Sequence, residues 1–194
     1  MAVSIHKRFI VHPYKFNMWI AIVSMVMIFA AFTSAYVVKK GDTKTWADIQ
    51  LPQIFTLSTI VIVISSLLMH AAYVSFKKGA LEWYRGFMTL TFLAGAAFLS
   101  MQIQGWYTLV AQGVYLTDNV AGSFIYVISG AHFLHVAGGV IALLVFSIRS
   151  FTRYQASNIE AMKDTTINVE VMATYWHFVD ILWVYLFFFF MLNR

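Results

Sequence analysis

Five long apolar segments, each bounded by polar or charged residues, dominate the chain of 194 residues. A transmembrane helix needs about 20 mostly apolar residues to cross about 30 Å of hydrocarbon. None of the segments alternates apolar and polar residues with the period of two that a membrane β-barrel requires. The pattern predicts an all-α fold, a polytopic membrane helix bundle forming one domain over residues 1–194. Its five transmembrane helices are expected at residues 16–38, 52–76, 83–110, 120–148 and 171–192.

The connectors contain the residues that begin and end helices. Pro52 can occupy the first turn of the second helix, where its missing N–H costs nothing. Asp118 and Asn119 are candidate N-caps for the fourth helix. The stretch from Ser150 to Asn168 is the longest polar connector and has room for a short surface helix.

Lys and Arg are distributed unevenly between the two sides of the predicted bundle. The side of the N-terminus has nine, namely Lys7, Arg8, Lys15, Lys77, Lys78, Arg85, Arg149, Arg153 and Lys163. The other side has four, namely Lys39, Lys40, Lys44 and Arg194. Because cytoplasmic loops carry the excess of basic residues, the N-terminus is expected in the cytoplasm and the C-terminus outside.

The composition supports a membrane protein, since 61% of the residues are apolar and only 11% are charged. A soluble domain has about 45–50% apolar and about 25% charged residues. The net charge of +5 comes from basic residues scattered among connectors. They form no stripe interleaved with aromatic residues, so a nucleic-acid partner is not expected. The absence of cysteine excludes disulfides and thiolate metal sites.

Two histidines lie near the middle of the fourth predicted helix. His132 and His135 are about 60° apart around the helix axis, on the same face as Gly139 and Ala142. One interpretation is a metal or haem site, but such a site needs three or four ligands. The interpretation favoured here is a buried, hydrogen-bonded pair that ties helices together, with no metal bound.

Three candidate residues lie in or beside the fifth predicted helix: Glu170 lies just before it, and His177 and Asp180 lie within it. Glu170 and His177 lie about 20° apart on the helix surface, and Asp180 is about 15 Å beyond Glu170, close to mid-membrane. A charged group there is costly and usually faces protein or a cavity. Asp180 could serve a proton relay, pair with a histidine, or contact a partner subunit. The structural pair is favoured.

Arg149 ends the fourth predicted helix at the cytoplasmic side. Its guanidinium suits the geometry of a phospholipid phosphate, so it is a candidate lipid-binding residue. No Gly-rich phosphate loop and no Ser–His–Asp arrangement is present, so no catalytic residue is assigned. Whether the chain counts as an enzyme therefore depends on what it assembles with.

Several motifs resemble the cytochrome c oxidase subunit III family of the haem–copper oxidases. The most specific one is YWHFVDILW, residues 175–183, with Glu170 standing where the family has an acidic residue. SGAHFLHV, residues 129–136, is similar to the family motif of the preceding helix. Weaker matches occur at Met18–Trp19, Ser24–Met27, Leu51–Pro52, Ser65–His70 and Gly122–Phe124. The resemblance covers the chain from about Phe16 onward and is closest to the short, five-helix bacterial form.

The resemblance implies a non-catalytic subunit of a terminal oxidase in the bacterial plasma membrane. The reaction, reduction of oxygen to water with proton pumping, belongs to the complex, and haem and copper are expected in the partner catalytic subunit I. The family also implies a V-shaped cleft that holds phospholipid. Under this interpretation His132, His135, Glu170, His177 and Asp180 form a buried polar network that holds the fourth and fifth helices together.

Two positions depart from the family pattern. Met25 stands where the family usually has a buried Glu, so a proton-carrying role for that position is not expected here. Gly105 stands where the family often has a Glu after Gln102. The electron donor is left open between cytochrome c and quinol, because neither docks on this subunit. An independent membrane transporter and a pure assembly factor are the remaining alternatives.

Overall fold

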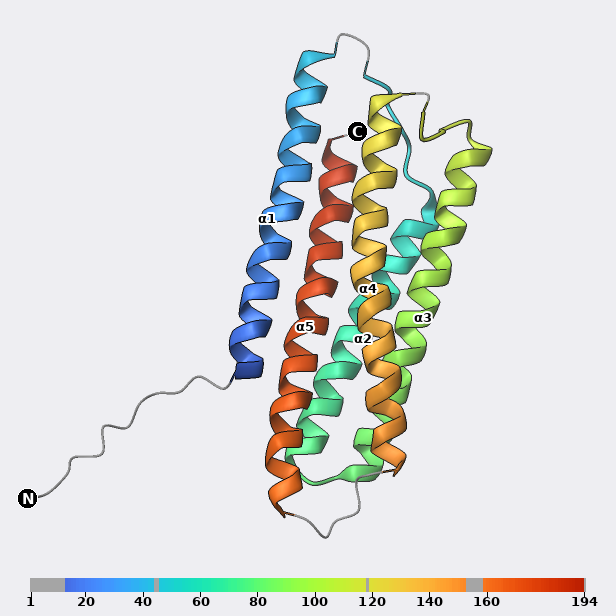
Figure 1. Ribbon diagram of the computed structural model, residues 1–194. Coiled ribbons are helices and arrows are strands. Elements are labelled where there is room, and N and C mark those ends of the chain that lie inside the picture. Colours follow the sequence, from blue (N-terminus) through green and yellow to red (C-terminus); the bar gives the residue numbers. More distant parts are fainter. Residues whose placement is uncertain (1–12, 44–45, 118, 153–158, 194) are drawn as a thin grey trace, which may run out of the picture.

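The computed structural model describes residues 13–43, 46–117, 119–152 and 159–193, with side chains of the last segment described from residue 166 onward. The prediction of an all-α bundle is confirmed, since every regular element of the described residues is a helix (Figure 1). All five helices are long and apolar enough to cross a membrane. They are α1 (Pro13–Asp42), α2 (Gln53–Lys77), α3 (Leu81–Ala111), α4 (Val120–Thr152) and α5 (Ile159–Leu192).

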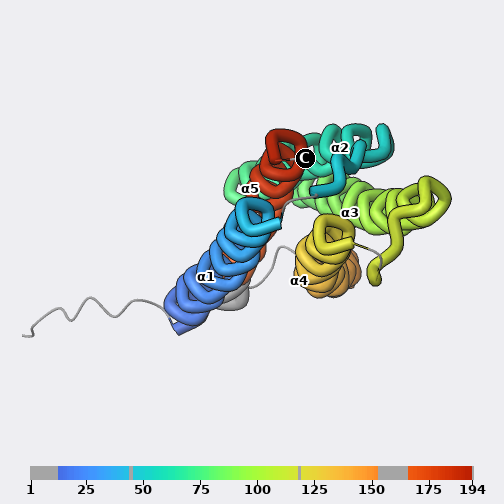
Figure 2. The backbone as a smooth tube through the Cα atoms, turned by 90° about the horizontal axis from the view of Figure 1, so that it is seen from above, coloured from blue at the N-terminus to red at the C-terminus, as the bar shows by residue number. Residues whose placement is uncertain are grey.

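The helices run alternately up and down along the bundle (Figure 1). Viewed along the bundle, α5 lies between α1 and α2, while α3 packs along α2 and α4 closes the bundle against α3 and α5 (Figure 2). Among the described helices α1 contacts only α4 and α5. α1 is therefore the most peripheral helix, and it leans away from α4 toward its N-terminal end (Figure 2).

The helix ends agree with most of the local predictions. Asn119 is the N-cap of α4, since its side-chain oxygen accepts a hydrogen bond of 2.6 Å from the backbone N–H of Gly122. Pro52 is the N-cap of α2 rather than its first helical residue. The other candidate cap, Asp118, lies outside the described residues, as do Lys7, Arg8, Lys44, Arg153 and Arg194 of the charge count.

The predicted start of the fifth helix was wrong. The sequence between Ser150 and Asn168 has room for a separate surface helix, but α4 extends to Thr152 and α5 begins at Ile159. A run of apolar residues predicts only the part of a helix that lies in hydrocarbon. The helix α5 extends beyond that part into a polar stretch of the sequence. The membrane-spanning portion of α5 begins at about Thr166.

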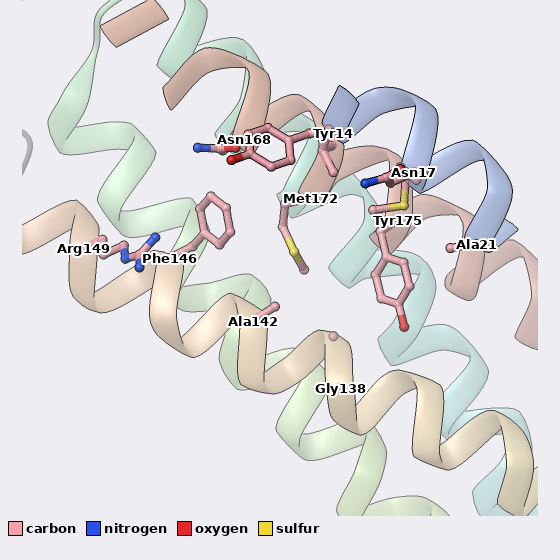
Figure 3. Close-up of a pocket in the computed structure, with 13 residues that line it drawn as sticks. Tyr14, Asn17, Ala21, Gly138, Ala142, Phe146, Arg149, Asn168, Met172 and Tyr175 are labelled. Carbon is pink, nitrogen blue, oxygen red and sulfur yellow. The ribbon is translucent and has the colours of Figure 1, made fainter. Parts of the chain in front are cut away.

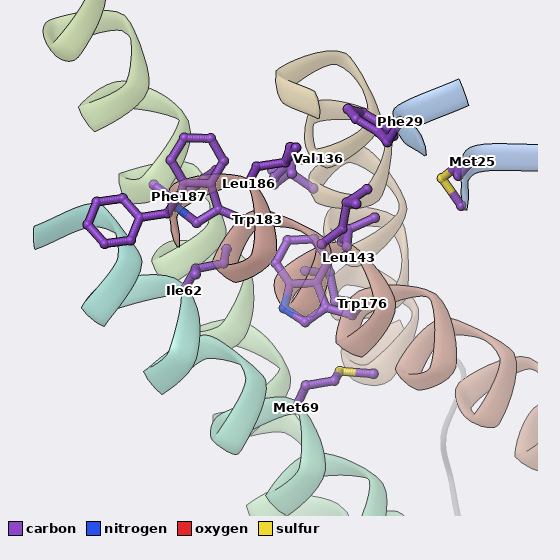
Figure 4. Close-up of a cluster of buried hydrophobic side chains, with 14 of the residues drawn as sticks. Met25, Phe29, Ile62, Met69, Val136, Leu143, Trp176, Trp183, Leu186 and Phe187 are labelled. Carbon is purple, nitrogen blue, oxygen red and sulfur yellow. The ribbon is translucent and has the colours of Figure 1, made fainter. Parts of the chain in front are cut away.

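The core is built around two tryptophans of α5. Trp176 and Trp183 are fully buried and point toward the other helices (Figure 4). The indole of Trp176 lies between two glycines, Gly95 of α3 and Gly139 of α4. A Cβ atom would lie 2.8 Å from Trp176 Cη2 at Gly95, and 2.9 Å from Trp176 Cζ3 at Gly139. The two glycines therefore let three helices approach one large side chain.

Candidate functional site

Hydroxyl groups of α2 accept hydrogen bonds from the buried tryptophans of α5. Trp176 donates from Nε1 to Ser65 Oγ at 3.0 Å, and Trp183 donates from Nε1 to Thr59 Oγ1 at 3.0 Å. A buried indole N–H needs such a partner, because lipid and the apolar core offer none. These bonds fix the rotation of α5 relative to α2.

The helix α3 is held by similar bonds on both sides. Gln102 donates from Nε2 to Ser58 Oγ of α2 at 3.0 Å. Trp106 donates from Nε1 to Ser129 Oγ of α4 at 3.0 Å. Small hydroxyl residues therefore link neighbouring helices at several depths of the bundle, as is common in membrane proteins.

His177 and Asp180 flank Ser66 of α2. Ser66 Oγ and His177 Nδ1 share a hydrogen bond of 2.7 Å. Asp180 is only 3% exposed, and neither of its carboxyl oxygens has a hydrogen-bond partner in the described part of the chain. The Ser66 hydroxyl of α2 lies close to Asp180. A second histidine, His70 of α2, has its ring centroid 6.2 Å from that of His177.

The two histidines of α4 face α1 and α5 through ring contacts. His132 is fully buried, stacks on Trp183 with ring centroids 5.1 Å apart, and has no partner for either ring nitrogen among the described residues. His135 donates from Nδ1 to the carbonyl of Ala131, within its own helix, at 2.7 Å. Both imidazoles also meet the edge of Phe29 of α1.

Glu170 lies apart from the other four candidate residues. Its carboxylate accepts a hydrogen bond of 2.8 Å from Lys15 Nζ of α1, in an ion pair whose side chains are both about one-third exposed. At the opposite end of α1, Tyr36 and Lys40 donate to the carbonyl of Asn193. Polar contacts therefore attach α1 to α5 at both ends of the pair.

The five candidate network residues therefore occupy three settings. His177 and Asp180 face α2, His132 and His135 lie against aromatic rings, and Glu170 pairs with α1. The α4–α5 bond in this region is made instead by Tyr175, whose hydroxyl donates to the carbonyl of His135 at 2.8 Å. Within the described ranges, no group of three or more His, Cys, Asp or Glu residues is placed to hold a metal ion.

A hollow of about 650 Å³ lies between α1, α4 and α5 at the end where α1 leans outward. Its walls are mostly apolar, and Phe146 and Met172 point into it (Figure 3). Arg149 and Asn168 line it near the ends of α4 and α5. Arg149 is exposed beside this mostly apolar space.

Comparison with known proteins identifies the family. The family model described as cytochrome c oxidase subunit III matches residues 2–193. This chain belongs to the cytochrome c oxidase subunit III family. Subunit 3 of cytochrome c oxidase from Thermostichus vulcanus is 31% identical over 170 residues, which are 86% of this chain and 80% of the relative. A probable cytochrome c oxidase subunit 3 from Nocardia farcinica is 32% identical over 172 residues, 84% of this chain and 80% of the relative.

A quinol oxidase subunit is similar to almost the same extent. The cytochrome bo(3) ubiquinol oxidase subunit 3 of Pseudomonas aeruginosa is 29% identical over 176 residues, 89% of this chain and 81% of the relative. As a member of the subunit III family, the chain is a multi-pass membrane protein, with five candidate spans among the described residues. Its position 25, where the family motif usually has Glu, holds a methionine buried among apolar residues.

The sequence reveals the subunit III motif but not the residues of other helices that form hydrogen bonds with it. The sequence analysis does not predict a contact for Ser58, Thr59 or Gln102, although all three take part in bonds between helices. One signal was available, because Ser58 and Ser65 are seven residues apart and share a face of α2 with buried Ile62 and Met69. Hydroxyl residues on a buried helix face indicate contacts with polar groups of neighbouring helices.

Proposed function

We propose that this chain is the non-catalytic subunit III of a bacterial terminal oxidase complex, in the plasma membrane, that reduces oxygen to water and pumps protons. The observation that carries the proposal is the match of the subunit III family over residues 2–193. Haem and copper reside in the partner catalytic subunit I. The role of this chain is to support that subunit, and cytochrome c is the proposed electron donor of the complex.

Purification of the native complex tests this function. With an affinity tag on this chain and gentle solubilisation, mass spectrometry is expected to find a haem-bearing polypeptide, and visible absorption to show its haem bands. Membranes without the tag give the background. Recovery of the chain alone, with a bound metal and no haem protein, would mean that it works independently, as a transporter does.

Quinol is the second candidate donor, and the similarity of this chain to the bo(3) ubiquinol oxidase subunit supports this alternative. Because the donor docks on another subunit, the contacts of this chain do not distinguish the two. Oxygen consumption by the purified complex with reduced cytochrome c, compared with a reduced quinol, decides between them.

We further propose that the hollow between α1, α4 and α5 is the lipid cleft of this subunit. An anionic phospholipid would place its acyl chains against the apolar walls and its phosphate beside Arg149. The buried polar groups of α4 and α5 then serve the packing of the helices. A methionine at position 25 removes the carboxylate that could have carried protons there.

Replacing Arg149 with alanine is expected to lower the amount of anionic phospholipid that co-purifies with the complex, because the phosphate loses a guanidinium partner. Native mass spectrometry measures the bound lipid. Lys78→Ala is the matched control, since Lys78 is exposed at the end of α2 and does not line the hollow. Equal lipid loss in both variants would show that Arg149 acts only through general surface charge.

A further inference from the structure

The outward side of the contact between α2 and α5 carries a group of polar side chains, which we call the histidine seam: Ser66, His70 and His177. His70 is the one exposed histidine among the described residues, and His177 is half-buried. The two ring centroids are 6.2 Å apart, and Ser66 bonds to His177 Nδ1. Neither His70 nor Nε2 of His177 has a hydrogen-bond partner within the described ranges.

The histidine seam lies at the depth of lipid hydrocarbon. Seven residues separate His70 from Lys77 at the end of α2, and seven separate His177 from Glu170. At 1.5 Å per residue, both imidazoles are about 10 Å further into the membrane than these charged groups. Acyl chains at that depth offer no hydrogen-bond partner. Ionisable side chains at such depth usually face protein or a water-filled cavity.

The exposed face of α4 and two exposed serine hydroxyls suit lipid. The exposed face of α4 is apolar along its length, from Val127 through Leu134 and Ile141 to Ile148. The exposed hydroxyls of Ser24 on α1 and Ser100 on α3 bond to carbonyl groups of their own helices. The histidine seam is different because, within the described residues, its imidazoles make only one hydrogen bond, the contact of His177 Nδ1 with Ser66.

A buried carboxylate lies behind the histidine seam, and this also distinguishes the seam from the lipid-facing surfaces. Asp180 lies next to Ser66 with both carboxyl oxygens unpartnered in the described part of the chain. A line of polar groups therefore runs from buried Asp180 through Ser66 and His177 to exposed His70. Its outer end has hydrogen-bonding capacity that no group in the described part of this subunit uses.

We propose that the histidine seam docks a transmembrane helix of another subunit of the same complex. That helix presents a hydrogen-bonding group to His70 and to Nε2 of His177, about 10 Å inside the membrane surface. A lipid or an entirely apolar helix would leave both imidazoles unpaired. The inference rests on the proposed function, because it needs a complex whose other subunits also span the membrane.

Single-cysteine variants of this cysteine-free chain test the seam in the intact complex. His70→Cys and Leu67→Cys, one turn away on the same helix, are each labelled with a photoactivatable maleimide or with a nitroxide. Ile141→Cys is the control, since it is exposed on α4, eight residues before Arg149, at a similar depth. The unmodified chain gives the labelling background of the other subunits.

The cysteines at positions 67 and 70 are both expected to cross-link to another subunit, and their nitroxides to be severalfold less accessible to dissolved oxygen than the one at position 141. Oxygen accessibility equal to that of the control, or cross-links only to lipid or to a second copy of this chain, would overturn the proposal. In these cases the complex itself still contains its haem protein, so the proposed function stands. A chain that purifies without other subunits overturns the proposed function, and the seam proposal with it.

Discussion

Replacing Gly139 with valine is expected to disrupt the packing of α4 against α5 and to reduce sharply the amount of this chain that remains in the complex. A Cβ atom at this position would lie 2.9 Å from Trp176 Cζ3 and 3.0 Å from Tyr175 Cε1, before the two further methyl groups of valine are added. Trp176 cannot move aside, because its other edge already meets Gly95. Overpacking of a filled core costs about 1–3 kcal/mol and occasionally more.

The neighbouring glycines provide matched controls. Gly138 and Gly130 lie on the same helix, and a Cβ atom at either would meet nothing within 4 Å. Gly138→Val and Gly130→Val should therefore leave the complex intact. The measurement is the amount of this chain that remains in the complex after solubilisation and heating. Retention of Gly139→Val at the same level as both controls would contradict the close packing of α4 on Trp176.

Much of the fold was predictable because a membrane imposes a simple rule on sequence. Each span must be about 20 apolar residues long, so the predicted second, third and fourth helices began within two residues of the observed ones. The start of α5 was not predictable in this way. Ile159 begins a helical stretch of polar residues outside hydrocarbon, where apolar length carries no information.

For the candidate site, the sequence predicts only the face of the helix on which each residue lies. Rotation by 100° per residue placed Glu170 and His177 on one stripe of the fifth helix. It could not say that Glu170 would meet Lys15 of α1 while His177 met Ser66 of α2. Partners across helices depend on which helices are neighbours and how each is rotated, and neither quantity is encoded in the period of one helix.

His132 illustrates the same limit. Its position near mid-membrane suggested a hydrogen-bonded pair with a neighbouring helix. In the structure it is buried between Trp183 and the edges of Phe29 and Phe98. Its environment is therefore aromatic, and the large flat rings around it come from three different helices. Such a setting arises from the shape of the packed core and has no local sequence signal.

Replacing Trp183 with alanine is expected to have the other large effect, a loss of about 3–5 kcal/mol of stability. The indole stacks on His132, meets the ring of Phe98 with centroids 5.3 Å apart, and contacts Phe55 of α2. Truncation would leave a cavity among three other helices and would leave Thr59 without its indole donor. We would measure the temperature at which the chain dissociates from the purified complex.

Two further variants separate packing from hydrogen bonding at this position. Trp183→Phe keeps an aromatic ring but loses the N–H, so it should cost much less than the alanine variant. Thr59→Val keeps the shape of its side chain but leaves Nε1 of Trp183 unpaired, at a cost of about 1–3 kcal/mol. Trp19→Ala is the control, because that indole is 60% exposed and its loss opens no cavity. An equal fall in dissociation temperature for Trp19→Ala and Trp183→Ala would mean that the core around Trp183 does not hold the bundle together.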